Sequence, residues 1–360
     1  MVARLVAELE RLIAIPTDRD CLPFLDYLEE RLPFIPFERQ PVPKEVEGRR
    51  QCNLVAIDPS RPFLVNTHVD TVPPITMEEP FRARVRDGKI YGRGAADTKG
   101  LIAALILALE DFHRENPSTP PPVSLAFTVD EENHTALGSE SLLERLDPIE
   151  AILVLEPTYG RPCLRQLGSL EFELEVRAPS CHAATFSRFP NPAKWLLSWF
   201  QEAERVLDRP LNLIRISSGW DHYAVPDRAI LLAEVQLTER DDPRGIERKL
   251  RTLAEQMAED VEVTYRRIDV EPFLQLGEEG AFTAFLQAYR ETVGEPEPAT
   301  MPSWTDAANF AKKPRPCLVW GEGKLEVAHT EREHITLEEL RRNYEVLSSL
   351  LRILSQSPTV

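Results

Sequence analysis

The chain has 360 residues, of which 42% are hydrophobic and 28% charged, a composition typical of a globular protein large enough for two domains. Its formal net charge of −17 argues against nucleic acids and anionic membranes as partners, because both repel an acidic protein. No uninterrupted apolar stretch approaches the ~20 residues of a membrane span. The five cysteines lack the C-x-x-C spacing, which favours reduced thiols in the cytoplasm.

The first half of the chain alternates between predicted helices and strands. It opens with an amphipathic helix whose charges are spread along its length, unlike those of a signal peptide. Apolar runs predict buried parallel strands at 62–67, 123–129 and 151–156. Residues 97–113 are apolar on nearly every side and predict a buried helix. This alternation predicts an α/β domain with a mixed, largely parallel sheet flanked by helices.

The pattern changes at residue 168. Segments that alternate apolar and charged residues predict antiparallel strands at 168–178, 228–240 and 260–268. Helical apolar spacing is found between them, at 191–208 and 243–260. We therefore expect an α+β domain, residues 168–271, inserted into a first domain formed by residues 1–167 and 272–360.

The last part of the chain completes the first domain. Residues 317–320 are a fourth apolar run and predict another buried parallel strand. Residues 336–354 predict an amphipathic helix that covers the sheet. Thr336 is its expected N-cap, and Glu339 the partner in a capping box.

Residues that bind metal ions or transfer protons follow each strand predicted in the first domain. They are His68 and Asp70 after the first strand, Glu131 and Glu132 after the second, Glu156 at the end of the third and His329 after the fourth. Ligands of open α/β sheets bind beyond the carboxyl ends of the strands. We therefore expect these side chains to share one site.

These groups also have ordinary interpretations. His68 and Asp70 could form a surface turn ahead of Pro73–Pro74, or a metal ligand with a carboxylate that orients its imidazole. Glu131 and Glu132 could form a solvated turn. Because they follow a buried strand, they could instead divide two tasks, one binding a metal ion and the other accepting a proton.

Asp97 precedes the predicted buried helix and could simply cap it. The surrounding Gly92, Gly94 and Gly100 allow close approach of the backbone, which suits a crowded ligand site better. His134 follows the acidic turn and is expected at the surface. The signatures of serine hydrolases, phosphate loops, dinucleotide-binding folds and H-E-x-x-H metallopeptidases are absent.

Five motifs, taken together and in order, resemble those of one enzyme family. They are H-x-D-T-V-P, Y-G-R-G-A-A-D-T-K-G, D-E-E, E-P-T and A-H-T-x-x-E, and they span almost the whole chain. This set resembles the co-catalytic zinc family of acetylornithine deacetylase, succinyl-diaminopimelate desuccinylase, aminoacylase and glutamate carboxypeptidase. That family inserts a lid or dimerisation domain before its last metal motif, where residues 168–271 lie here.

The resemblance implies two Zn²⁺ ions, with Co²⁺ or Mn²⁺ as alternatives. The ligands of the first ion would be His68, Asp97 and Glu156, and those of the second Asp97, Glu132 and His329. Asp97 would thus bridge the two ions, and the resemblance implies a cis peptide bond between Asp97 and Thr98.

Three further residues receive roles from the resemblance. Glu131 would be the general base that takes a proton from a metal-activated water and later protonates the departing amine. Asp70 would orient His68. His182, in the inserted domain, would steady the tetrahedral oxyanion, and in dimeric relatives this histidine reaches the active site of the other subunit.

The implied function is that of a metal-dependent amidohydrolase that cleaves an N-acyl amino acid, closest to acetylornithine deacetylase. A dipeptidase or carboxypeptidase with the same dinuclear site is an alternative, and so is a non-catalytic amino-acid-binding relative. Glu131 argues against the last, because a binding protein needs no base. The expected partners are a small N-acyl amino acid or short peptide and a second copy of the chain, in a homodimer formed through residues 168–271.

Several positions depart from the family pattern. The glycine before the lid histidine is missing from A-P-S-C-H-A-A, and Glu322 replaces the proline of the Gly-Pro-Gly before the last histidine. Thr238 stands where relatives carry an arginine that binds the substrate carboxylate, with Arg240 two residues later. The asparagine of the usual N-x-x-P is absent from D-H-Y-A-V-P-D. The metal ligands are unaffected, but the motifs leave the substrate open.

Overall fold

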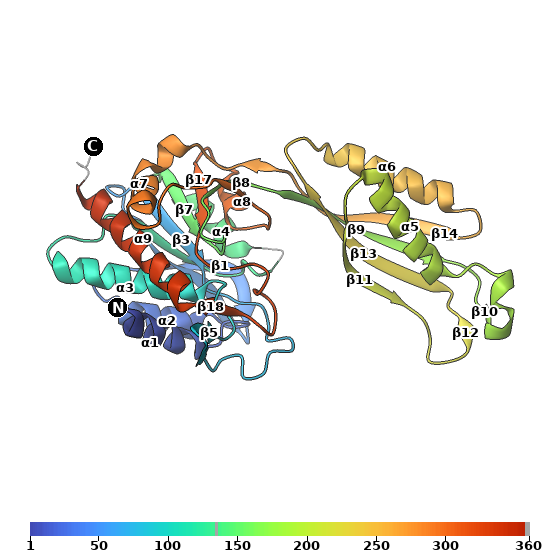
Figure 1. Ribbon diagram of the computed structural model, residues 1–360, viewed down its shortest axis with the longest axis horizontal. Helices are drawn as coiled ribbons and strands as arrows, with labels where there is room; N and C mark the ends of the chain where they lie inside the picture. The colour runs from blue at the N-terminus through green and yellow to red at the C-terminus, as the bar shows by residue number, and fades with distance from the viewer. Residues whose placement is uncertain (134–135, 357–360) are drawn as a thin grey trace. The chain divides into compact units, whose positions relative to one another are not determined.

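The computed structural model describes residues 1–133 and 136–356, so that His134, expected at the surface, lies outside the described residues. The chain forms two compact units, one of residues 1–165 and 275–360 and the other of residues 166–274. Figure 1 labels most of their helices and strands. Among the described residues, no helix combines the length and apolar character that crossing a membrane requires.

A mixed sheet is the centre of the first unit, in the order β1-β2-β6-β3-β7-β17-β8-β15, with β16 paired to β8. Its strands are β1 (Glu38–Val46), β2 (Arg49–Ala56), β3 (Phe63–His68), β6 (Ser124–Thr128), β7 (Ala151–Leu155), β8 (Cys163–Gln166), β15 (Leu274–Gln275), β16 (Ala299–Met301) and β17 (Cys317–Trp320). The adjacent strands β6, β3, β7 and β17 are parallel to one another. They are the four strands predicted from the apolar runs, and the predicted fold class is confirmed.

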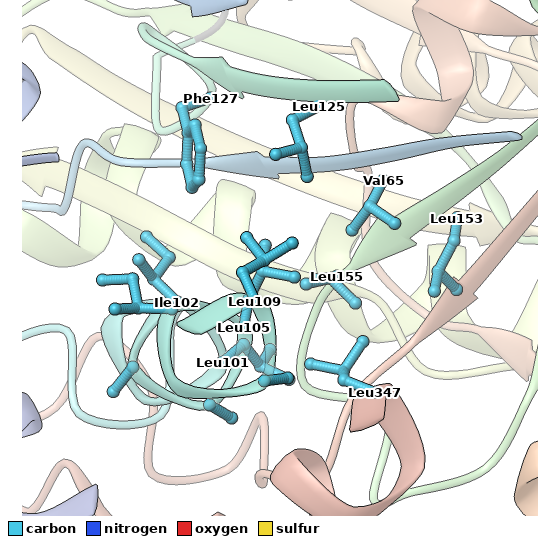
Figure 2. Close-up of a cluster of buried hydrophobic side chains, with 14 of the residues drawn as sticks. Val65, Leu101, Ile102, Leu105, Leu109, Leu125, Phe127, Leu153, Leu155 and Leu347 are labelled. Carbon is cyan, nitrogen blue, oxygen red and sulfur yellow. The ribbon is translucent and has the colours of Figure 1, made fainter. Parts of the chain in front are cut away.

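Helices surround this sheet and enclose its core. They are α1 (Val2–Ile13), α2 (Leu22–Arg31), α3 (Lys99–Glu115), α4 (Leu137–Leu142), α7 (Thr283–Thr292), α8 (Ala307–Phe310) and α9 (Leu337–Gln356). Helix α3 is buried on almost every side, as its apolar sequence predicts. Figure 2 shows its leucines in one cluster with side chains of β3, β6, β7 and α9. Each fully buried side chain of this kind contributes about 1.5–3 kcal/mol to stability.

The predicted capping box of α9 is confirmed. The Thr336 N–H donates to Glu339 Oε2 at 2.8 Å, and the Glu339 N–H donates to Thr336 Oγ1 at 3.1 Å. Thr336 also ends the small sheet of β4 (Arg84–Arg86), β5 (Lys89–Tyr91) and β18 (His334–Thr336). Strand β18 therefore leads directly from the segment after His329 into the helix that covers the core.

The second unit is an α+β structure with its own core. Its antiparallel sheet has the order β11-β13-β9-β14, formed by β9 (Gly168–Arg177), β11 (Asn212–Ser218), β13 (Arg228–Leu237) and β14 (Glu262–Glu271). Helices α5 (Pro192–Leu207) and α6 (Pro243–Met257) pack on this sheet. A short pair of strands, β10 (Cys181–His182) and β12 (Ala224–Val225), holds the segment of the predicted lid histidine. Alternate residues of β9 are buried, as its alternating sequence predicts.

Strands β1 and β11 are two strands that the sequence patterns did not predict, and the structure gives a physical reason for each. Strand β1 contains Pro41 and Pro43, which cannot donate to a ladder, but it lies at the end of its sheet, where proline is tolerated. Strand β11 is also an end strand, and all seven of its residues are exposed, so that no buried face shapes its sequence.

Candidate metal centre

The parallel strands bring the predicted ligands to one edge of the sheet. His68 ends β3 opposite Thr128, the last residue of β6, so the turn that follows β6 starts beside it. The His68 imidazole is fully buried, and its Nε2 lies 3.0 Å from Asp97 Oδ1 and 3.5 Å from Glu156 Oε1. The three residues predicted to hold the first metal ion therefore lie in direct contact.

The second predicted set meets on the other oxygen of Asp97. His329 Nε2 lies 3.4 Å from Asp97 Oδ2 and 2.9 Å from Glu132 Oε2. The two carboxylate oxygens of Asp97 thus face different histidines, which is the arrangement that a bridging ligand needs. The peptide bond between Asp97 and Thr98 is cis, as the resemblance implies.

The donor atoms at this site suit divalent cations. In the part of the chain that the structure describes, two groups of side chains have possible ligand atoms within 4.8 Å of one another: His68, Asp97 and Glu132, and His68, Glu131 and Glu156. Glu132 Oε1 and Glu156 Oε1 are buried without a hydrogen-bond partner among the described residues, which is costly unless a cation contacts them. Imidazole nitrogens and carboxylate oxygens are ligands that Zn²⁺, Co²⁺ and Mn²⁺ accept, so the residues present fit a dinuclear site.

The pKa values of these groups show an excess of negative charge. Burial by itself lowers the pKa of the His68 imidazole, but the carboxylates of Glu156 and Glu131 raise it well above its ordinary value. Burial raises the pKa of Glu156 to about 8 and that of Glu131 well above its ordinary value. The cluster therefore favours added positive charge, which divalent cations supply without protonating the ligands.

Asp70 contacts both His68 and the acidic turn that follows β6. His68 Nδ1 lies 3.0 Å from the backbone carbonyl oxygen of Asp70 but 3.7 Å from its carboxylate. The carboxylate instead accepts the N–H groups of Glu131 and Glu132, at 3.2 and 3.0 Å. Asp70 thus contacts the imidazole most closely through its backbone carbonyl, while its carboxylate holds the acidic turn.

His182 belongs to the second unit, where it is exposed. It is the N-cap of the short 3₁₀ helix Ala183–Arg188, and its Nδ1 accepts the N–H of Ala184 at 3.1 Å. An imidazole whose Nδ1 accepts a hydrogen bond carries its proton on Nε2 when it is neutral. The other ring nitrogen of His182, Nε2, is therefore a hydrogen-bond donor.

Glu333, Arg93 and Asp306 are buried near the centre, and no role was predicted for them from the sequence. Glu333 and Arg93 form an ion pair beside Asp97, with 2.6 Å between Glu333 Oε2 and Arg93 Nη1. Asp306 accepts the Thr128 hydroxyl at 2.6 Å, at the end of β6. Glu333 closes the motif A-H-T-x-x-E and Arg93 lies in Y-G-R-G, so the motifs contain a signal for both residues. Their pairing across 240 positions could not be read from either motif.

Comparison with known proteins agrees with this geometry. The chain matches the family model "Peptidase family M20/M25/M40" over residues 64–353. It is 26% identical over 310 residues to a succinyl-diaminopimelate desuccinylase of Thioalkalivibrio sulfidiphilus, covering 79% of this chain and 81% of that protein. The protein of that name from Xanthomonas euvesicatoria is 28% identical over 302 residues, covering 76% of this chain and 78% of its own.

Solved structures share the fold over the full length. Human carnosine dipeptidase 1 superimposes with a TM-score of 0.79 at 16% identity, covering 99% of this chain and 97% of its own. A tripeptidase of Staphylococcus aureus gives a TM-score of 0.75 at 18% identity, with 99% of both chains covered. With a family match over most of its length and a candidate metal site at the expected edge of the sheet, the chain belongs to peptidase family M20/M25/M40 and is a hydrolase that acts on amide bonds.

Proposed function

We propose that the protein is a dinuclear metallohydrolase that removes a small acyl group from an N-acyl amino acid. The observation that carries this proposal is the position of the buried Asp97, whose two oxygens face the buried His68 and the half-exposed His329. His68, Asp97 and Glu156 would hold one cation, and Asp97, Glu132 and His329 the other, with Zn²⁺, Co²⁺ or Mn²⁺ as candidates. When bound, such ions polarise the substrate carbonyl and lower the pKa of a water molecule.

Glu131 is the proposed proton carrier. It adjoins the proposed ligand Glu132, and its carboxylate oxygen lies within 4.8 Å of donor atoms of His68 and Glu156. The Asp70 carboxylate accepts hydrogen bonds from the backbone of the turn that contains Glu131, and this fixes the backbone position from which the Glu131 side chain extends. In this position Glu131 takes a proton from the attacking water and returns it to the departing amine.

A substrate panel tests the deacylase proposal. Relatives named succinyl-diaminopimelate desuccinylase favour an N-succinyl amine as the substrate, and the motif resemblance to acetylornithine deacetylase adds N-acetyl amines to the panel. We expect release of free amine from N-acetyl or N-succinyl amino acids, measured with an amine-reactive dye, in protein loaded with Zn²⁺, Co²⁺ or Mn²⁺. Turnover of dipeptides alone would replace the deacylase by a peptidase. Purified protein that holds no metal and hydrolyses neither class would be a binding protein.

We further propose that the protein is a homodimer formed through the second unit. Strand β11 ends the four-stranded sheet, and its residues, including Leu213, Ile214 and Ile216, are exposed. An exposed apolar end strand is a template for pairing with another strand. Pairing with its own copy about a two-fold axis would bury this edge.

We also propose a cytoplasmic location for the protein. Its five cysteines form no disulfide bonds, which is typical of proteins in a reducing compartment.

In the proposed homodimer, His182 would donate its Nε2–H to the oxyanion at the other subunit's metal centre. Mixing His182→Ala with Glu131→Ala protein tests this directly. Each variant alone should be nearly inactive. After subunit exchange at equal amounts, roughly a quarter of parental activity should return, because half of the dimers are mixed and one of their two sites has both groups.

The dimers must be shown to exchange, for example by mass spectrometry with one variant isotopically labelled. Mixed dimers that form and stay inactive would show that His182 does not act across the interface. A protein that sediments as a monomer at working concentration would contradict the dimer itself.

A further inference from the structure

We propose that Glu333, paired with Arg93, is a positioning residue that fixes the carboxylate of Asp97 between the two proposed cations. The inference rests on the proposed dinuclear centre. Glu333 Oε1 accepts two successive backbone N–H groups, from Ala96 at 3.1 Å and from Asp97 at 3.3 Å. One side chain thus holds the backbone from which the bridging carboxylate projects.

The other oxygen of Glu333 is fixed by Arg93. Arg93 Nη1 lies 2.6 Å from Glu333 Oε2, and Arg93 Nη2 donates to the carbonyl oxygen of Pro74 at 3.2 Å. Both side chains of the ion pair are 1% exposed. The backbone adds a further tie, because the Gly92 N–H donates to the Glu333 carbonyl at 3.3 Å. Glu333 is therefore held at both carboxylate oxygens and cannot turn away from Asp97 without breaking several contacts.

Glu333 also links two loops that supply ligands to the same proposed cation. It follows His329 by four residues, while Asp97 lies more than 230 positions earlier in the chain. The contact therefore fixes the distance between the segments that carry His329 and Asp97. Asp70 makes a similar contact with the acidic turn, where it accepts the N–H groups of Glu131 and Glu132.

A buried ion pair is an unusual choice if stability were the only requirement. Two well-packed apolar side chains of similar volume often stabilise a protein as well or better. A charged carboxylate, however, forms stronger and more directional bonds to backbone N–H groups than a neutral acceptor. A buried ion pair whose carboxylate binds two backbone N–H groups therefore indicates that Glu333 and Arg93 fix the position of Asp97 at the metal centre.

The test compares Glu333→Gln with Glu331→Gln. Glu331 lies in the same loop but its side chain is 56% exposed, so it is a matched control. Each protein is loaded with Co²⁺, and its affinity is measured by competition with a chromophoric chelator together with the visible absorption of the bound ion. We expect Glu333→Gln to bind Co²⁺ about 10–100-fold more weakly and with an altered spectrum, as for other residues that orient metal ligands. Glu331→Gln should match the parent.

A second variant covers the case in which Glu333→Gln leaves Arg93 uncompensated and the protein does not fold. The double variant Arg93→Met/Glu333→Met leaves no buried charge at this position. We expect it to fold, to bind Co²⁺ more weakly, and to exchange the amide hydrogens of residues 96–97 faster than the parent in the metal-free state. kcat should fall more than KM changes.

The proposal is overturned if a folded variant of Glu333 keeps the parental Co²⁺ affinity and spectrum, even at a lower melting temperature. A parent that binds no metal would overturn it together with the dinuclear centre. A parent that binds two Co²⁺ ions but hydrolyses no acyl amino acid would remove the deacylase proposal alone, because the metal-binding comparison does not use turnover.

Discussion

Replacing Glu131 with glutamine should lower kcat by about 10²–10⁴-fold while both metal ions stay bound. Glutamine has nearly the same shape as glutamate, but its amide cannot take a proton from water or return one to the departing amine. The backbone contacts of the turn with Asp70 do not involve the Glu131 side chain, so the loop should keep its position. Two quantities are measured for the variant and the parent. One is kcat with an acyl amino acid that the parent hydrolyses, and the other is metal content determined by mass spectrometry.

The neighbouring glutamate supplies the control. Glu132→Gln should lose metal content as well as activity, because Glu132 Oε2 lies 2.9 Å from His329 Nε2 in the proposed second ligand set. The two variants thus separate a proton carrier from a ligand one position apart. Turnover by Glu131→Gln within about tenfold of the parent would refute its assignment as general base.

Removing divalent metal with a chelator should abolish hydrolysis and lower the melting temperature. The first effect follows from the loss of carbonyl polarisation and water activation. The second follows from linkage, since a ligand present at 1,000 times its Kd stabilises the folded state by about 4 kcal/mol. Without cations, the buried carboxylates of Asp97, Glu132 and Glu156 also repel one another. Activity and melting temperature should both return on addition of Zn²⁺, Co²⁺ or Mn²⁺.

Asp97→Asn is the control for specific binding. An asparagine offers only one oxygen, so it cannot share a carboxylate between His68 and His329. Added metal should then raise the melting temperature of this variant much less than that of the parent. Full activity in chelated protein with no detectable metal would contradict the metal-dependent mechanism.

Part of the fold follows from the sequence because its signals are local. The four central strands are apolar runs that are buried on both faces, and α3 is apolar on nearly every side for the same reason. The capping box of Thr336 and Glu339 depends on residues three positions apart, so its geometry is set within one helical turn. The shared location of His68, Glu131 and Glu156 also follows from the sequence, because parallel strands deliver their carboxyl ends to a common edge, whereas the assignment of ligands to each ion is implied only by the family resemblance.

Other features depend on tertiary structure. Strand β1 forms despite its prolines because it is placed at the end of the sheet. The Asp70 carboxylate lies 3.7 Å from the His68 ring and within hydrogen-bonding distance of two backbone N–H groups, a choice of partner that no spacing rule contains. Glu333 meets Arg93 across 240 positions. Local spacing identifies which side chains can reach a site. Which atoms form hydrogen bonds there depends on differences in distance of a few tenths of an ångström, and these differences are set only when the whole chain packs.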